Sequence, residues 1–377
     1  MEIYLDNGAT TRVCPEAADA AYKVMTELYG NPSSTHRKGR VAKALLDRAR
    51  RQVADALGAK TTEIVFTSCG SESDNWALLM GAKAMERRGR HIISSTAEHD
   101  AIRQSLAELE KRGFEITLLS PGKDGAIEAE ALRAALRPDT ILVSLMMVNN
   151  ETGAVTDIAA MRRVLKESGS QALLHTDAVQ AFLKVPFSAK TLGADMISLS
   201  GHKIHAPKGI GALYIRQGLK LAPYILGGGQ EGGLRSGTEP LPQIAAFGAA
   251  AEVGYKEAAA AQARMAALRQ RCIDALLTEA PETVIIGGGA PHVLNLSLPG
   301  YRSEVLMNWL EAKEIYVSKG SACKRGKRSH VLEAMGLPAR VIDGAIRVSL
   351  SRFSTEAEID GFVQALLEAK RTLRAAL

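Results

Sequence analysis

Lys203 is the first of two lysines in the stretch SLSGHKIHAPKGIGAL at residues 198–213, and it follows an apolar run that ends at Leu199. Lysine is among the residues least often buried, so its place at the end of a predicted buried strand needs a reason. Either Lys203 is a surface charge on a loop, or its amine is needed at the strand end as a nucleophile. The residues that follow the other predicted strands bear on this choice.

Polar residues follow one predicted strand after another. In open α/β sheets, ligands bind outside the carboxyl ends of the strands. The first apolar run is followed by SCGSESD (68–74), where glycine and hydroxyl groups at a helix start suit a phosphate. The later runs are followed by His99, by Asn149 and Asn150, by Asp177 and Gln180, and by Ser200, His202 and Lys203. We therefore expect one converging site.

Each of these residues also has an ordinary structural interpretation. Gly70 and Ser71 can cap a helix, whereas His99 can be a structural histidine. Asp177 can cap the next helix or hold a loop. Together, however, they match the needs of pyridoxal phosphate: amides and hydroxyls for the phosphate, a carboxylate for the pyridine nitrogen, and an amine for a Schiff base. This predicts that Lys203 binds the cofactor covalently and has a pKa below that of free lysine.

Cys323 is the second candidate for chemistry. Small residues precede it, and Lys324, Arg325, Lys327 and Arg328 follow it. Nearby cations favour the thiolate, which is the reactive form, and we expect a reactive cysteine. A buried structural cysteine, or an incidental thiol on a basic surface loop, is the alternative. No pair among the four cysteines has CxxC spacing, which predicts neither a disulfide framework nor a zinc site.

The elements that must position these residues alternate along the chain. Helical patterns separate short apolar runs, which predicts a mostly parallel sheet with helices on both faces. The predicted helices cover residues 15–29, 36–57, 73–88, 100–112 and 157–168. Near residue 240 the alternation of short strands and helices ends. A long helix, predicted over 252–278, and an α+β pattern follow. We expect a large cofactor-binding domain over 13–250 and a smaller domain made of 1–12 and 251–377, which carries the Cys323 loop.

Composition excludes several classes of protein. The 47 Lys and Arg against 41 Asp and Glu in 377 residues are spread out, which gives no reason to expect a nucleic-acid partner. No apolar run approaches the roughly 20 residues that span a bilayer. The opening MEIYLDNGATT lacks the pattern of a signal peptide. We expect a cytoplasmic protein with reduced thiols and without a membrane partner.

Ten sequence blocks, in this order and over nearly the whole chain, resemble those of cysteine desulfurases in the class V, fold-type I family of pyridoxal-phosphate enzymes. They are YLDNGATT (4–11), GNPSSTHRKG (30–39), FTSCGSESDN (66–75), AEHDA (97–101), VNNETG (148–153), HTDAVQ (175–180), SLSGHKIHAPKGIGAL (198–213), GGGQEGGLRSGT (227–238), GSAC (320–323) and IRVSLSRF (346–353). The resemblance implies the fold-type I architecture: a large domain with a mostly parallel sheet flanked by helices, and a smaller α+β domain.

The resemblance also implies roles for individual residues. Lys203 forms the Schiff base, Asp177 pairs with the pyridine nitrogen, and Gln180 bonds the phenolic oxygen of the cofactor. His99 stacks on the ring and shuttles a proton. The implied phosphate contacts are Gly70, Ser71, Ser200 and His202, with Thr238 reaching in from the partner subunit of a homodimer. Asn150 and Arg347 bind the substrate carboxylate, and Asn150 also contacts the cofactor. Cys323 accepts the sulfur.

The predicted function is therefore removal of sulfur from L-cysteine, which gives L-alanine and a persulfide on Cys323. An iron–sulfur scaffold or a tRNA-thiolation protein is the implied sulfur acceptor. Alternatives are a selenocysteine lyase, another lyase or an aminotransferase on the same fold. An aminotransferase would form a keto acid in place of alanine. A non-enzyme alternative is a persulfide-delivery scaffold, which would lack the cofactor colour.

Overall fold

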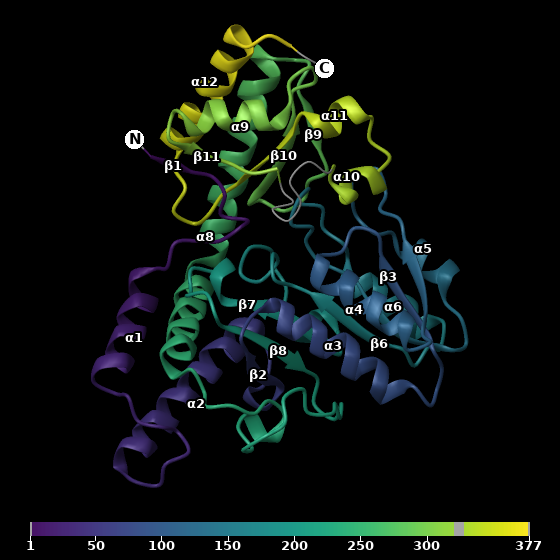
Figure 1. Cartoon of the computed structure of the whole chain (residues 1–377), viewed down its shortest axis with the longest axis vertical. Coiled ribbons are helices and arrows are strands. Elements are labelled where there is room, and N and C mark those ends of the chain that lie inside the picture. The colour runs from purple at the N-terminus through teal and green to yellow at the C-terminus, as the bar shows by residue number, and fades with distance from the viewer. Residues whose placement is uncertain (1, 320–327, 376–377) are drawn as a thin grey trace.

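The computed structural model describes residues 2–319 and 328–375. Figure 1 shows two parts stacked along the long axis, with the large sheet in the lower part and both chain ends in the upper part. Helix α8 (Leu241–Glu279) runs from one part to the other. The site lies where the two parts meet, so the large sheet is described first.

Within the described ranges, the large sheet has seven strands in the order β2-β8-β7-β6-β5-β3-β4. The strands are β2 (Ile64–Thr67), β3 (His91–Ser95), β4 (Glu115–Leu119), β5 (Thr140–Ser144), β6 (Leu173–Asp177), β7 (Met196–Ser200) and β8 (Gly211–Ile215). The neighbours from β4 to β7 pair in parallel, and β8 pairs antiparallel with β7 and β2. The predicted mostly parallel sheet is confirmed, although β8 was not predicted.

Helices cover both faces of this sheet, which is why its central strands are buried along their whole length. Successive side chains of a strand point to opposite faces. Leu173 therefore packs with Trp76 on one side, whereas Leu174 packs in the core cluster of the other side. The helices of this part are α1 (Pro15–Thr26), α2 (Arg37–Leu57), α3 (Gly70–Met85), α4 (Asp100–Lys111), α5 (Ala129–Ala135), α6 (Ile158–Glu167) and α7 (Ala189–Leu192).

Helix α8 begins at Leu241, so the prediction of a start at residue 252 was wrong. The missed turns are rich in small residues, which weakens a helical hydrophobic pattern. Gly248 lies where α8 packs on α2, and a Cβ there would be 2.5 Å from Gln52 Oε1 and 2.7 Å from Ala49 Cα. Small residues are thus required for the close approach of the two helices.

The upper part holds a small antiparallel sheet in the order β12-β10-β9, and strand β1 (Ile3–Tyr4) pairs with β11 (Ile315–Tyr316). The other strands here are β9 (Val284–Ile286), β10 (Val293–Ser297) and β12 (Ala345–Ser349). The helices are α9 (Ser303–Glu311), α10 (His330–Ala334), α11 (Ala339–Asp343) and α12 (Glu356–Thr372). The N-terminal segment therefore packs with C-terminal elements. The predicted domain bounds stay a prediction, and the bound at residue 250 falls within α8.

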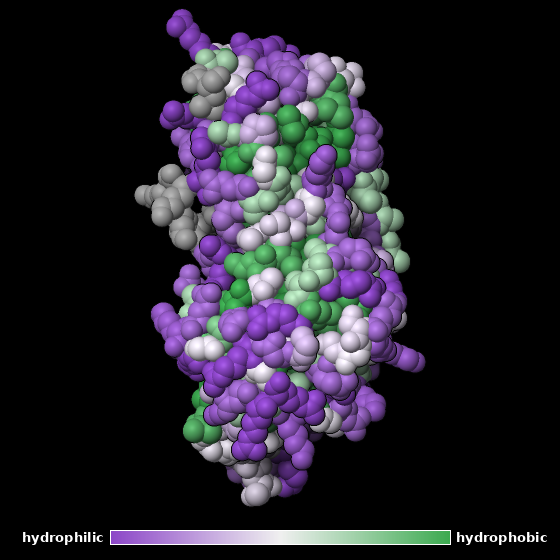
Figure 2. Space-filling model, turned by 90° about the vertical axis from the view of Figure 1, so that its right-hand side faces the viewer, coloured by the Kyte–Doolittle hydropathy of each residue, from purple (hydrophilic) through white to green (hydrophobic). Residues whose placement is uncertain are grey.

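Figure 2 shows one face of the molecule largely covered by hydrophilic side chains, with hydrophobic ones gathered in two patches, one in each part. Among the described residues, no helix combines the length and the hydropathy that crossing a bilayer requires.

Candidate active site

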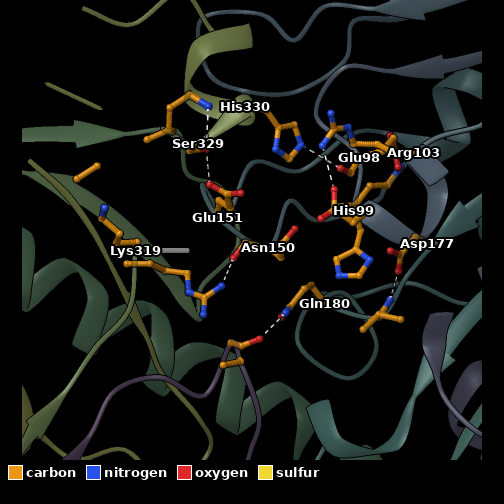
Figure 3. Close-up of a pocket in the computed structure, with 18 of the residues that line it drawn as sticks. Glu98, His99, Arg103, Asn150, Glu151, Asp177, Gln180, Lys319, Ser329 and His330 are labelled. Atoms are coloured by element: carbon orange, nitrogen blue, oxygen red, sulfur yellow. Dashed lines mark hydrogen bonds and ion pairs between the residues drawn. The ribbon is translucent and has the colours of Figure 1, made fainter. Parts of the chain in front are cut away.

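A cavity of about 1160 Å³ lies at the carboxyl ends of β6 and β7, between the large sheet and the upper part. Figure 3 shows His99, Asn150 and Gln180 around its centre, with Ser329 and His330 above them. Of the residues predicted for the site, the lining includes Gly70, Ser71, His99, Asn150, Asp177, Gln180, Ser200, His202, Lys203 and Arg347. The strand-end rule therefore located a real convergence of side chains.

One predicted site residue that the structure describes is not part of this lining. Thr238 is exposed and lies outside the cavity of its own chain, so its predicted contact with a partner subunit stays a prediction. Cys323 lies outside the described residues. Lys319 and Ser329, which stand on either side of that segment, both line the cavity.

Lys203 ends a short 3-10 turn, η2 (Gly201–Lys203), directly after β7. Its Nζ donates hydrogen bonds to Gly8 O at 2.7 Å and Ala9 O at 2.8 Å. Burial, followed by the charge of Arg347, lowers the pKa of Lys203 to about 8. The direction agrees with the prediction. An amine with this pKa is a better base and nucleophile near neutral pH than an ordinary lysine.

Asp177 is the last residue of β6, and its Oδ1 accepts a hydrogen bond of 2.9 Å from Val179 N. Asp74, on α3, is fully buried behind it, with Oδ1 3.8 Å from His175 Nε2. Burial raises the pKa of Asp177, which the charges of His99 and Lys203 oppose. Burial and the charge of Asp177 raise the pKa of Asp74 well above its usual range. Of these two carboxyl groups, Asp177 is therefore the one whose ionised form the neighbouring cations favour.

The start of α3 forms a narrow cradle. A Cβ at Gly70 would be 2.7 Å from Val179 Cγ2, so this position admits only glycine without a shift. Ser200 Oγ is buried beside it and has no hydrogen-bond partner among the described residues. His202 also lines the cavity, and its Nδ1 lies 3.2 Å from Thr10 Oγ1. Burial lowers the pKa of His202 to about 4, so its ring is neutral at pH 7.

His99 caps α4, and its Nδ1 accepts a hydrogen bond of 3.1 Å from Ala101 N. Because Nδ1 accepts, the neutral ring carries its proton on Nε2. The ring is exposed and lines the cavity, so Nε2 is open to a ligand.

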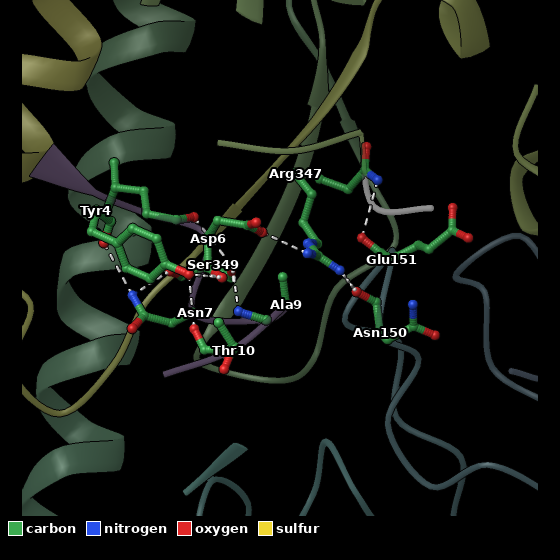
Figure 4. A network of polar contacts seen from close by, with 12 residues as sticks. Tyr4, Asp6, Asn7, Ala9, Thr10, Asn150, Glu151, Arg347 and Ser349 are labelled. Atoms are coloured by element: carbon green, nitrogen blue, oxygen red, sulfur yellow. Dashed lines mark hydrogen bonds and ion pairs between the residues drawn. The ribbon is translucent and has the colours of Figure 1, made fainter. Parts of the chain in front are cut away.

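Arg347, on β12, is buried and reaches the cavity from the opposite side. Figure 4 shows its guanidinium between Asp6 and Asn150. Arg347 Nη2 lies 2.7 Å from Asp6 Oδ1, and Nη1 donates to Asn150 O at 2.7 Å. The segment that carries Asp6 is itself held by β12, since Gly8 N donates to Ser349 Oγ at 2.7 Å. The position of the Arg347 side chain thus depends on a chain segment 341 residues away in the sequence.

Sequence reasoning missed the roles of Asp6, which pairs with a lining residue, and of Glu98, which lines the cavity. Asp6 lies in the YLDNGATT block, but nothing in that block shows that it pairs with Arg347. Glu98 precedes His99 and is fully buried, with Oε1 accepting from Ser95 Oγ at 2.6 Å and from Met146 N at 3.0 Å. Burial raises the pKa of Glu98 to about 8. Its position beside His99 in the AEHDA block is the signal that could have found it.

The residues beside segment 320–327 are held by polar contacts. Arg328 makes a two-pronged ion pair with Asp343, with both N–O distances 2.7 Å, and Lys319 pairs with Glu304. Ser329 Oγ donates to Glu151 Oε2. Arg328, one of the four cations that follow Cys323 in the sequence, therefore already has an acidic partner.

Comparisons with known proteins agree with this geometry. Residues 3–362 match the model of the aminotransferase class-V family. Cysteine desulfurase 2 of Trichormus variabilis is 46% identical over 99% of this chain and 94% of its own length. The cysteine desulfurase IscS of Methanosarcina thermophila is 42% identical over 99% of this chain and 93% of its own. A solved NifS-like protein superimposes with a TM-score of 0.93 at 38% identity, covering 99% of this chain and all of that one. The chain therefore belongs to the aminotransferase class-V family.

Proposed function

We propose that this protein is a cysteine desulfurase that uses pyridoxal phosphate to move sulfur from L-cysteine to its own Cys323. The relatives at 42% and 46% identity, matched over 99% of the chain, support the activity. The observation that carries the proposal is the position of Lys203: a largely buried amine with a pKa of about 8 that shares one cavity with Asp177 and the cradle at Gly70.

Class-V aminotransferases and cysteine desulfurases depend on pyridoxal phosphate, and the residues of the cavity fit this group. The cradle at Gly70 leaves no room for a side chain, and the start of α3 presents backbone amides that suit a phosphate. The unpartnered Ser200 Oγ beside it would gain a hydrogen-bond partner. Asp177 is a buried carboxylate that would gain a counter-ion from a protonated pyridine nitrogen.

The bound cofactor would supply an electron sink for bond breaking at the substrate carbons. Lys203 Nζ would bind the cofactor and, once released by the incoming amine, take the proton from the substrate Cα. Asp177 would keep the ring nitrogen protonated, because a buried carboxylate favours a cation beside it. His99 would cover the ring and move a proton through Nε2.

The sulfur step would be carried by Cys323. Its thiolate attacks the substrate sulfur, a sulfur–sulfur bond forms, and the bond between Cβ and sulfur breaks. The electron pair of that bond goes to Cβ, which gains a proton, so that cysteine becomes alanine and the thiol becomes a persulfide. The step needs no added oxidant or reductant, since the carbon is reduced as the transferred sulfur is oxidised.

Substrate binding and assembly complete the proposal. Arg347 and Asn150 would hold the substrate carboxylate, because a guanidinium pairs with a carboxylate through two parallel hydrogen bonds. Thr238 would contact the cofactor phosphate of the partner subunit in a homodimer. The persulfide must be passed on, so an iron–sulfur scaffold or a tRNA-thiolation protein would accept it, in the cytoplasm.

The test is a visible absorption spectrum of the purified protein with pyridoxal phosphate, before and after addition of L-cysteine, with assays for alanine and sulfide. A cofactor band that responds to L-cysteine, with alanine formed in step with sulfide, is the expected result. Pyruvate in place of alanine would point to an aminotransferase. The absence of any cofactor band would contradict the proposal.

A further inference from the structure

Lys184 is a buried lysine that the proposed mechanism does not use. It lies in the turn that follows β6, with 8% of its surface exposed. Burial lowers the pKa of Lys184 to about 7, and the charges of Lys203 and Arg347 act in the same direction. Other basic side chains near it are His202, His205 and His292, whose pKa values its charge lowers. Because burial and the charges of Lys203 and Arg347 disfavour the charged amine of Lys184, its ammonium needs a hydrogen-bond acceptor.

That acceptor is in the side chain of Gln180, four residues earlier in the same turn. Lys184 Nζ donates to Gln180 Oε1 at 3.3 Å, and Gln180 Nε2 donates to Gly8 O at 2.8 Å. Gly8 O also accepts a hydrogen bond of 2.7 Å from Lys203 Nζ. The two lysines are thus joined through one amide and one carbonyl, and Gln180 faces the cavity (Figure 3).

The chemistry of these groups fixes the orientation of the amide. A lysine ammonium can only donate hydrogen bonds, so the amide oxygen must face Lys184. The NH2 group of Gln180 must then face the other way, where one hydrogen goes to Gly8 O and the second remains for an acceptor. Lys184 Nζ and Gly8 O thus hold the amide from two sides, and without a donor at position 184 only the hydrogen bond to Gly8 O would hold it.

We propose that Lys184 is a positioning residue whose amine holds the oxygen of the Gln180 amide, and so turns the NH2 group of Gln180 toward the phenolic oxygen of the cofactor. This inference rests on the proposed function. A donor at the phenolic oxygen stabilises negative charge there. The nitrogen through which Lys203 binds the cofactor then has a lower pKa than it would have if the phenolic oxygen accepted no hydrogen bond from Gln180.

The experiment is a pH titration of the visible absorbance of the cofactor-loaded protein. Lys184→Met removes the donor and keeps approximately the length of the side chain. The pH midpoint of the absorbance change should then rise by about one pH unit, which is the scale of one lost charge-assisted hydrogen bond. Lys184→Arg keeps donors and charge and should retain the wild-type midpoint. Lys190→Met, the same change at an exposed lysine nearby, should leave the midpoint unchanged.

A double-variant cycle separates positioning from a simple effect of charge. In a Gln180→Met background there is no amide to orient, so adding Lys184→Met should shift the midpoint by less than about a third of its effect in the wild type. An undiminished shift in that background, or no shift in Lys184→Met alone, would overturn the inference. If Lys184→Met does not fold, Lys184→Leu, which also lacks a donor, replaces it, and an unchanged midpoint would count against the inference in the same way.

The outcomes also distinguish this inference from the function on which it rests. A wild-type protein without a cofactor band contradicts the proposed function. If the wild-type protein binds the cofactor and forms alanine, but Lys184→Met has the same titration midpoint as the wild type, only the role of Lys184 is contradicted.

Discussion

Two walls of the cavity differ in how they are built. The strand-end wall consists of Asp177, Gln180, Ser200 and Lys203, which follow β6 and β7 of the large sheet. The C-terminal wall consists of Lys319, Ser329, His330 and Arg347, from the upper part. The first wall is anchored in strands that are buried on both faces. The second is held by ion pairs and hydrogen bonds between segments far apart in the chain. The comparison suggests that cofactor retention belongs to the first wall, and substrate capture and sulfur transfer to the second.

The sharpest test of the strand-end wall is Lys203→Ala. Removing both the amine that binds the cofactor and the base should lower alanine formation by on the order of 10⁴-fold or more. The cofactor band that depends on the covalent bond should also disappear from the visible spectrum. A retained band would show that another group holds the cofactor.

On the C-terminal side, Cys323→Ser should separate the two walls. Because a hydroxyl cannot accept sulfur from cysteine as a thiolate does, sulfide and alanine formation should fall by on the order of 10³-fold. The visible spectrum should keep the cofactor band. Full desulfurase activity in this variant would show that Cys323 is not the acceptor.

A smaller effect is expected from Arg347→Gln. Loss of a charged hydrogen-bond donor to the substrate carboxylate should lower kcat/KM for L-cysteine by roughly 10- to 100-fold, mainly through KM. Asp6→Asn, which leaves Arg347 in place without its ion pair, should have a weaker effect in the same direction.

Arg340→Gln, at an exposed position of the upper part, is the control for Arg347→Gln. If Arg347→Gln lost as much cofactor absorbance as Lys203→Ala, the contrast between the two walls would fail, since Arg347 would then be needed for cofactor retention.

The smallest effect concerns the pH dependence of stability at Glu98, whose backbone oxygen accepts a hydrogen bond of 3.2 Å from His330 Nε2 of the C-terminal wall. The pKa of Glu98 is raised from 4.5 to about 8, so the folded protein binds this proton more tightly than the unfolded chain. Its contribution to stability is therefore present at low pH and is lost as the pH rises through that window. Glu98→Gln lacks this titration and should gain stability relative to the wild type with rising pH, by at most about 1.4 kcal/mol per pH unit.

Urea unfolding at several pH values measures this difference. Glu110→Gln, an exposed change on α4, should show a constant difference from the wild type across the same pH values. A constant difference for Glu98→Gln as well would show that this carboxyl titrates normally in the folded protein.

The sequence predicted the strand-end wall better than the C-terminal wall, for a physical reason. Asp177 and Lys203 follow apolar runs directly, and parallel strands bring such residues to one edge of a sheet. The pairing of Asp6 with Arg347 depends on how the segment after β1 meets β12, which no local pattern encodes. Lys184 was missed for a similar reason, because only the fold reveals that it is buried.

The same contrast applies to the elements. Helix α2 was predicted closely, because His36 caps its start and Gly58, with φ of 67°, ends it. The start of α8 was missed where small residues serve helix packing rather than amphipathic patterning. Strand β8 (Gly211–Ile215) was missed because the glycines before it were interpreted as part of the lysine loop.

The pairing of the N-terminal segment with β12 has a consequence for synthesis of the protein. Gly8 O accepts from both Lys203 and Gln180, and Gly8 N is held by Ser349. A ribosome makes residue 8 long before residue 349. The large sheet can form while translation continues, since domains fold as units during synthesis. The pocket for the vitamin-derived aldehyde, however, cannot be completed until β12 has emerged, so the newborn chain cannot have a complete site before β12 is made.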